Sequence, residues 1–209
     1  NLSVMTSVQQ SIMNFGILMV QGLVNSFGTV IMAAFAAAVK IDSFAYMPVQ
    51  DFGNAFSTYV AQNYGAGQSD RLRQGLRQAT AVSAAFSCAA AALVVVFARP
   101  LMGLFVQAGD TAVIACGVRY LRIEGTFYAA IGCLFLLYGF YRAVQRPGMS
   151  VVLTVISLGT RVVLAYALAG PVGEVGIWAA IPIGWFLADA AGYGYYLRHR
   201  KALLTPRAQ

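Results

Sequence analysis

The sequence is poor in charged residues and in the side chains that usually carry catalysis. Only 10% of its 209 residues are charged, whereas about a quarter are charged in ordinary soluble domains. It has one histidine, His199, and three cysteines, Cys88, Cys116 and Cys133, whose spacing fits no metal-ligand pattern. No Ser-His-Asp, Cys-His or HExxH arrangement is present. These absences argue against an enzyme, a metal site and a bound cofactor.

Long apolar runs are the main feature that is present. Hydrophobic residues make up 59% of the chain, and its mean hydropathy is +0.70. The net charge of +7 could suit nucleic acid, but the Lys and Arg residues lie between apolar runs, as they do in the loops of membrane proteins. The composition therefore predicts an integral membrane protein of the all-α class.

The apolar runs divide into six predicted transmembrane helices. A helix needs about 20 mostly apolar residues to cross the hydrocarbon core. The runs cover approximately residues 3–24, 30–62, 78–98, 120–142, 148–169 and 175–197, and Pro48 should bend the second helix. We expect residues 1–197 to form one six-helix lobe, followed by a basic cytoplasmic tail at 198–209.

The distribution of Lys and Arg predicts the orientation. If the six helices alternate, nine basic residues lie in the loops 2–3 and 4–5 and in the tail, and four lie on the other side. Because basic loops stay in the cytoplasm, we expect the N-terminus, both basic loops and the C-terminus to be cytoplasmic.

Polar side chains form stripes on the first two predicted helices. Asp51, Asn54 and Thr58 share one helical face, with Gln50 beside it. Such groups cost about 2–3 kcal/mol each against lipid, so they should face protein or water. We predict a substrate and ion cavity lined by Asp51, Gln50, Asn54, Thr58, Asn14, Gln21 and Asn25. The alternative is a hydrogen-bonded seam that holds helices together.

Two further charges lie deep in predicted helices. Arg161 is in the fifth helix and Asp189 is in the sixth. We expect them to form a structural ion pair, with Glu124 as the competing partner of the arginine.

Several segments resemble one transporter family. They are the Gln- and Asn-lined first helix, "NSFGTVIMAAFAAAVKIDSFAYMP", "AQNYGAGQSDRLRQG", "YGFYRAVQRPGMS" and "LGTRVVLAYALAGPVGEVGIWAAIPIGW". Over nearly its whole length the chain resembles the C-terminal six-helix lobe of a multidrug and toxic compound extrusion (MATE) transporter, with the DinF-like branch as one candidate.

The resemblance implies two lobes around a central cavity, in a bacterial inner membrane. Such transporters export organic cations in exchange for H⁺ or Na⁺ and need no other cofactor. The expected partners are membrane lipid, a small organic cation, and either the missing N-terminal lobe or a second copy of this lobe. The chain begins at Asn1 and carries one Gly-Ala-Gly turn, as expected of a fragment or a half-transporter.

The chain also departs from the family pattern. NorM-like members have acidic cation-site residues at positions that match Asn14 and Ile131, and neither is acidic here. Asp51 is therefore the expected local substitute. Two other functions remain open: a lipid-linked oligosaccharide flippase of the same superfamily, which would need more cationic residues in its cavity, and a membrane module that transports nothing.

Overall fold

The computed structural model describes residues 2–205, and helices account for nearly all of them. No strand occurs among these residues, which confirms the predicted all-α class. The helices are α1 (Leu2–Asn25), α2 (Thr29–Gly65), α3 (Ser69–Val96), α4 (Ala98–Gly103), α5 (Thr111–Gly125), α6 (Tyr128–Ala143), α7 (Pro147–Val172) and α8 (Glu174–Leu204).

Most of these helices are long enough to cross a membrane. Four of them, α2, α3, α7 and α8, are both long and apolar enough, and α5 with α6 makes a fifth candidate if the bent pair is one span. Helix α1 is not among these candidates, and it carries the polar stripe of Gln and Asn residues. The chain is a multi-pass membrane protein.

Three features differ from the expected six helices. The fourth predicted span is two helices that meet at a bend of 54°, with the break between Gly125 and Tyr128. A short helix, α4, and a loop precede it. Helix α8 continues to Leu204, so the first seven residues of the predicted tail are helical. Residues 206–209 of that tail lie outside the described residues.

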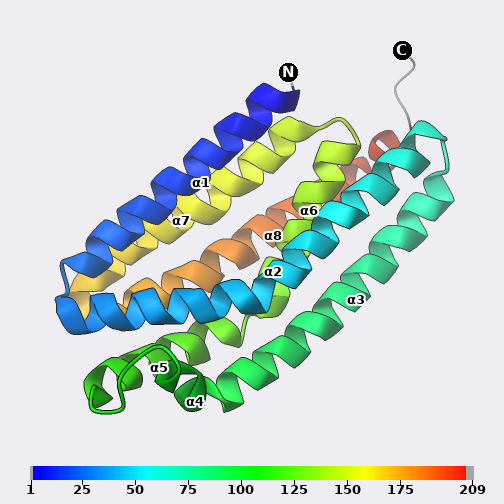
Figure 1. The fold of residues 1–209 in the computed structure, drawn as a ribbon. Coiled ribbons are helices and arrows are strands. Elements are labelled where there is room, and N and C mark those ends of the chain that lie inside the picture. Colours follow the sequence, from blue (N-terminus) through cyan, green and yellow to red (C-terminus); the bar gives the residue numbers. More distant parts are fainter. Residues whose placement is uncertain (1, 206–209) are drawn as a thin grey trace.

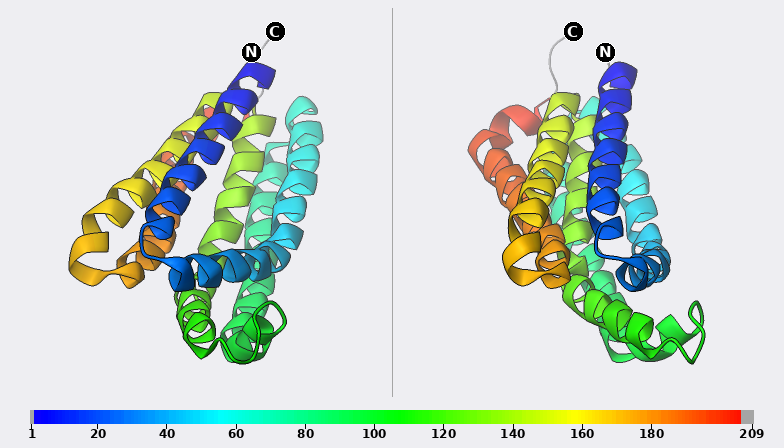
Figure 2. Two further views of the ribbon diagram at one scale, coloured as in Figure 1. Left: turned by 60° about the vertical axis from the view of Figure 1, so that its left-hand side comes forward. Right: turned by 90° about the vertical axis from the view of Figure 1, so that its left-hand side faces the viewer.

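The helices form a bundle in which α6 lies near the centre, packed against α2, α3, α7 and α8. Helix α1 runs alongside α7, and α3 lies on the far side of α2 and α6 (Figure 1). Helix α2 changes direction along its length, and Pro48 lies within it (Figure 2). Its two halves therefore pack against different neighbours, α5 and α6.

Helices α2 and α6 approach each other closely through two glycines. A Cβ atom placed on Gly139 would lie 2.6 Å from the carbonyl oxygen of Gly53. A Cβ atom on Gly53 would in turn lie 3.1 Å from the carbonyl oxygen of Phe135. Small residues at such crossings let the helix backbones meet. This crossing fixes how α2 and α6 present their polar side chains.

Aromatic rings fill the core where α2, α5 and α8 meet. Phe35 stacks on Trp178 with ring centroids 5.4 Å apart, and the edge of Tyr120 meets Trp178 at 4.9 Å. Trp178 is fully buried. Such ring pairs add about 0.5–1.5 kcal/mol each beyond their buried area. The rings hold together the helices that carry the buried charges.

Candidate functional site

A buried pair of carboxyl groups lies between α2 and α5. Asp42 is 2% exposed and Glu124 is 4% exposed. The hydroxyl of Tyr128 donates a hydrogen bond to Oδ1 of Asp42. Tyr120 and Glu124 also lie close enough to interact with this carboxyl group. Two acids and two phenols thus share one buried volume.

The bent span positions three of these four groups. Tyr120, Glu124 and Tyr128 follow one another at intervals of four residues. On α5 this spacing places Tyr120 and Glu124 on the same side of the helix, and Tyr128 joins them from the start of α6. The break after Gly125 separates Glu124 from Tyr128, so the cluster lies at the bend itself.

Arg161 lies near the two acids, and Trp178 packs against Tyr120 of the same cluster. The guanidinium of Arg161, on α7, is close enough to attract both carboxyl groups. Even so, Nε of Arg161 and Nε1 of Trp178 have no hydrogen-bond partner within the described chain. The same holds for Oδ2 of Asp42 and Oε2 of Glu124. Buried polar atoms without partners are few in proteins and call for an explanation.

Two neighbouring buried carboxyl groups repel each other when both are ionised, and a bound proton or cation relieves this repulsion. Inside a membrane, ionisable side chains usually mark ion pathways or proton relays. The free oxygens of Asp42 and Glu124 can each accept a hydrogen bond or coordinate a cation. The cluster therefore has the chemistry of a site for H⁺ or a small cation.

The expected pair between Arg161 and Asp189 is not formed. Within residues 2–205 the one salt bridge joins Arg119 to Glu174 at 2.7 Å. Arg161 instead lies near Asp42 and Glu124. Glu124 is the residue that the sequence predicted as the competing partner of this arginine. Asp189 is half-buried, and its Oδ1 has no hydrogen-bond partner within the described chain.

A second polar site is open and lies between α1, α2 and α6. A cavity of about 80 Å³ is lined by Thr6, Gln9, Gln10, Met13, Gln50, Asn54, Phe135, Tyr138 and Arg142. Nη2 of Arg142 donates to Oδ1 of Asn54 at 3.2 Å, and its Nε donates to the carbonyl of Tyr138 at 3.3 Å. Arg142 is half-buried and is the one charged residue that lines this cavity.

The residues predicted to line a cavity divide between this pocket and the exposed surface. Gln50 and Asn54 line the pocket. Asn14 is exposed and accepts a hydrogen bond from Gln10 at 3.3 Å. The remaining four are exposed and do not line it: Asp51, Thr58, Gln21 and Asn25.

Two functional candidates were missed by the sequence reasoning. Asp42 lies in the same helix as Asp51, but it is outside the polar stripe that begins at Gln50. Arg142 was counted as a loop charge, whereas it lies in the last turn of α6. The Tyr-Glu-Tyr repeat at intervals of four, inside an apolar run, is the sequence signal that could have identified the buried cluster.

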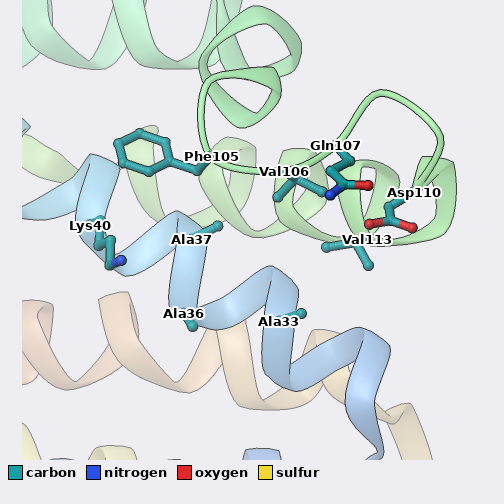
Figure 3. Close-up of a pocket in the computed structure, with 9 residues that line it drawn as sticks. All are labelled: Ala33, Ala36, Ala37, Lys40, Phe105, Val106, Gln107, Asp110 and Val113. Carbon is teal, nitrogen blue, oxygen red and sulfur yellow. The ribbon is translucent and has the colours of Figure 1, made fainter.

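A larger cavity of about 390 Å³ lies beside the loop between α4 and α5. Figure 3 shows Lys40 on α2 at one end, with Gln107 and Asp110 on the loop at the other. Lys40 and Asp110 form no salt bridge with each other. This cavity is separate from both polar sites described above.

Comparison with known proteins identifies the family. The MatE family model matches residues 3–167. The probable multidrug resistance protein YpnP of Bacillus subtilis is 28% identical over 196 residues, covering 93% of this chain and 44% of the relative. An FAD transporter of Shewanella oneidensis is 28% identical over 169 residues, covering 80% of this chain and 36% of the relative.

A solved structure gives the same result for the fold. The crystal structure of the Vibrio cholerae MATE transporter VcmN in its bent form matches with a TM-score of 0.86 at 21% identity. The match covers 94% of this chain and 44% of that one. The chain thus spans less than half the length of these relatives, with the fold of about half a MATE transporter. It belongs to the MatE family.

Proposed function

We propose that this chain is one lobe of a secondary active transporter that exports drug-like organic cations in exchange for H⁺ or Na⁺. The family and the multidrug resistance proteins among its relatives support export of drugs. The partner is a second six-helix lobe, either on the same polypeptide or on another copy. Movement of one lobe against the other would open the cavity to each side in turn.

The observation that carries the coupling proposal is the buried carboxyl pair. Within the described chain, Asp42 and Glu124 each keep one oxygen without a partner, although both are almost fully buried. A proton or Na⁺ bound between them would satisfy these oxygens and remove the repulsion of two charges. The pair lies at the break between α5 and α6, where a change in helix angle would alter the distance between the acids.

Asp51 has a different proposed role. It lies nine residues after Asp42, about 13 Å further along α2, and its side chain is exposed. An exposed carboxylate beside a polar pocket can attract a cationic substrate without being buried with the coupling ion.

We propose that the basic loops and both ends of this lobe face the cytoplasm, which places the pocket at the cytoplasmic end of α6.

The flippase function has less support. A pyrophosphate group carries several negative charges and would need more than one cationic residue. Arg142 is the one cationic residue lining the open pocket, and Arg161 lies with the buried acids. One relative is named an FAD transporter, so family members are not restricted to simple cations.

Dye transport into everted membrane vesicles tests the proposal. The complete gene product that contains this chain would be compared with Asp42→Asn, Glu124→Gln and Asp51→Asn. Asp70→Asn is the control, because Asp70 is an exposed acid in the first turn of α3. A proton gradient and a Na⁺ gradient would be imposed in separate experiments.

We expect native protein and the control to accumulate a cationic dye under one of the two gradients. Asp42→Asn and Glu124→Gln should abolish the response to the gradient while dye binding persists. Asp51→Asn should weaken dye binding instead. If both neutral variants of the buried pair respond to the gradient like native protein, the coupling site lies elsewhere. If native protein moves no dye under either gradient, the drug-export proposal fails.

A further inference from the structure

Two cavities adjoin where α2 passes α4 and the loop that precedes α5. The first is the cavity of about 390 Å³ beside this loop, a volume within the range of small-molecule sites. The second is an apolar groove of about 500 Å³ between α2, α3 and α4. Phe105 lines both cavities, and Lys40 of the first directly precedes Ile41 of the second on α2. One elongated molecule could therefore occupy both.

The first cavity holds two opposite charges that no described residue neutralises. Lys40 lies at one end of it, and Gln107 and Asp110 lie at the other (Figure 3). The one salt bridge within residues 2–205 uses neither charge. Asp110 also directly precedes the first turn of α5, where an aspartate usually caps the helix, yet its side chain makes no capping bond. A bound molecule could thus meet a cation at one end and a carboxylate at the other.

Small side chains keep the space between these two charges open. Ala33, Ala36 and Ala37 of α2 line this space. Their spacing of three and four residues places them on the same face of the helix as Lys40, and each presents only a methyl group to the cavity. The volume equals that of about 13 water molecules at about 30 Å³ each. A phosphate joined to a short amine fits within it, with each of its charges beside the opposite one.

The second cavity is lined by apolar residues alone. They are Ile41, Phe44, Ala45, Phe86, Ala90, Leu93, Val94, Leu101, Leu104 and Phe105. Phe44 is 72% exposed and Leu104 is 76% exposed, although both side chains are large and apolar. Exposed apolar surface of this kind marks a contact with membrane or with another protein. Because the chain is a multi-pass membrane protein, a hydrocarbon chain of a lipid is the occupant that its surroundings supply.

Both cavities lie at one end of the helix bundle. Helix α3 ends at Val96, and α4 and the loop follow it directly. Figures 1 and 2 show this region at the end opposite the turns that join α2 to α3 and α6 to α7. The ends of transmembrane helices lie at the level of the lipid headgroups, outside a hydrocarbon core about 30 Å thick. A charged cavity beside an apolar groove at this level matches the two parts of a phospholipid.

We propose that these two cavities together bind one phospholipid whose headgroup ends in a primary amine, as in phosphatidylethanolamine. The phosphate lies against Lys40, since a lysine ammonium binds phosphate as a point charge. The amine donates to the carboxylate of Asp110, and one acyl chain lies in the apolar groove beyond Phe105. The site is separate from the buried acids and from the open polar pocket, so the proposal does not depend on the coupling ion or on the exported compound.

Three phospholipids with identical acyl chains test this assignment. Phosphatidylethanolamine has N–H donors on its amine, phosphatidylcholine has the same charge without these donors, and phosphatidylglycerol has no positive charge. Their dissociation constants would be measured by native mass spectrometry, with each lipid added to the delipidated complete gene product that contains this chain. Glycerophosphoethanolamine, which is the same headgroup without acyl chains, distinguishes a lipid site from a site for a soluble ligand.

Three variants each remove one feature of the site. Lys40→Gln removes the partner of the phosphate, Asp110→Asn removes that of the amine, and Ala90→Phe fills the apolar groove that Ala90 lines. Lys40 and Asp110 are exposed, so replacing them leaves the core intact. The controls are Arg122→Gln and Asp70→Asn, each of which removes an exposed charge that lines neither cavity.

We expect native protein and both controls to bind phosphatidylethanolamine about tenfold more tightly than the other two lipids, as one charged hydrogen-bonding group allows. Asp110→Asn should bring this ratio close to one. Lys40→Gln and Ala90→Phe should weaken the binding of all three lipids, because the phosphate and the acyl chain are common to them. Glycerophosphoethanolamine should bind far more weakly than the lipid.

Several results would overturn the inference. A ratio of one in native protein would mean that the lobe makes only general contacts with lipid. A ratio that stays near tenfold in Asp110→Asn, or unchanged binding in Lys40→Gln or Ala90→Phe, would place the lipid elsewhere. Equally tight binding of glycerophosphoethanolamine would make the ligand a soluble molecule. If the native protein binds none of the three lipids, the other lobe covers this face and the inference fails.

Discussion

Gly139 lies where α6 crosses α2, and replacing it with alanine should separate these helices. The new Cβ atom would lie 2.6 Å from the carbonyl oxygen of Gly53, so reaching ordinary van der Waals contact requires the helices to move about 0.8 Å apart. Overpacking of this kind costs about 1–3 kcal/mol, and the better helix propensity of alanine returns up to about 1 kcal/mol. We expect Gly139→Ala to destabilise the folded protein by about 1–2 kcal/mol.

The crossing also positions the open pocket. Asn54 follows Gly53, and Arg142 lies three residues after Gly139. A shift of several tenths of an ångström would lengthen their 3.2 Å hydrogen bond past its useful range. Gly139→Ala should therefore weaken dye binding as well as stability.

Thermal unfolding of purified protein in detergent measures the loss of stability. One kcal/mol corresponds to about 2–4 °C in a chain of this length, so Gly139→Ala should unfold roughly 2–8 °C lower than native protein. Gly194→Ala is the matched control, because a Cβ atom at that helical position meets nothing within 4 Å. The reasoning is refuted if Gly139→Ala unfolds at the same temperature as Gly194→Ala.

Three further substitutions test individual contacts by the same unfolding measurement. Tyr128→Phe removes the donor to a buried carboxyl group and should cost about 1–3 kcal/mol; an unchanged unfolding temperature would mean that the hydroxyl does not bond to that acid. Arg119→Gln breaks a bridge to Glu174 whose arginine side chain is 53% exposed, so it should cost less than about 1 kcal/mol, and any loss should shrink in high salt. Ser83→Ala removes a buried hydroxyl that has no partner in the described chain and should be neutral or stabilising; a loss above about 1 kcal/mol would show a hidden partner.

The parts of the fold that local chemistry controls could be predicted from the sequence. The turn between the first two helices follows from Asn25, Ser26 and Gly28, and Gly28 has the positive φ of 97° that favours glycine. The break in the fourth span could not be predicted in this way. It contains no proline, and the apolar run that continues from Phe127 through α6 hides the change in direction.

The candidate sites depended on contacts between helices, which a periodic pattern within one helix does not show. The stripe from Gln50 to Thr58 was recognised because its members share a face of α2. The buried cluster instead brings Asp42 to Glu124 and Arg161 from three separate helices. Whether Asp51 contributes to function is still a prediction.

The burial of α8 has a consequence for how the lobe assembles during synthesis. The apolar stretch of α8 is 61% buried, against 22–33% for α2, α3 and α7, yet this helix leaves the ribosome after the other helices of the lobe. Until it enters the membrane, the rings of Phe35 and Tyr120 lack Trp178, the ring that both of them contact. The earlier helices must therefore wait in a loose arrangement, and quality-control proteases could recognise them during that interval. Truncations that remove α8 should be degraded rather than accumulate as shortened lobes.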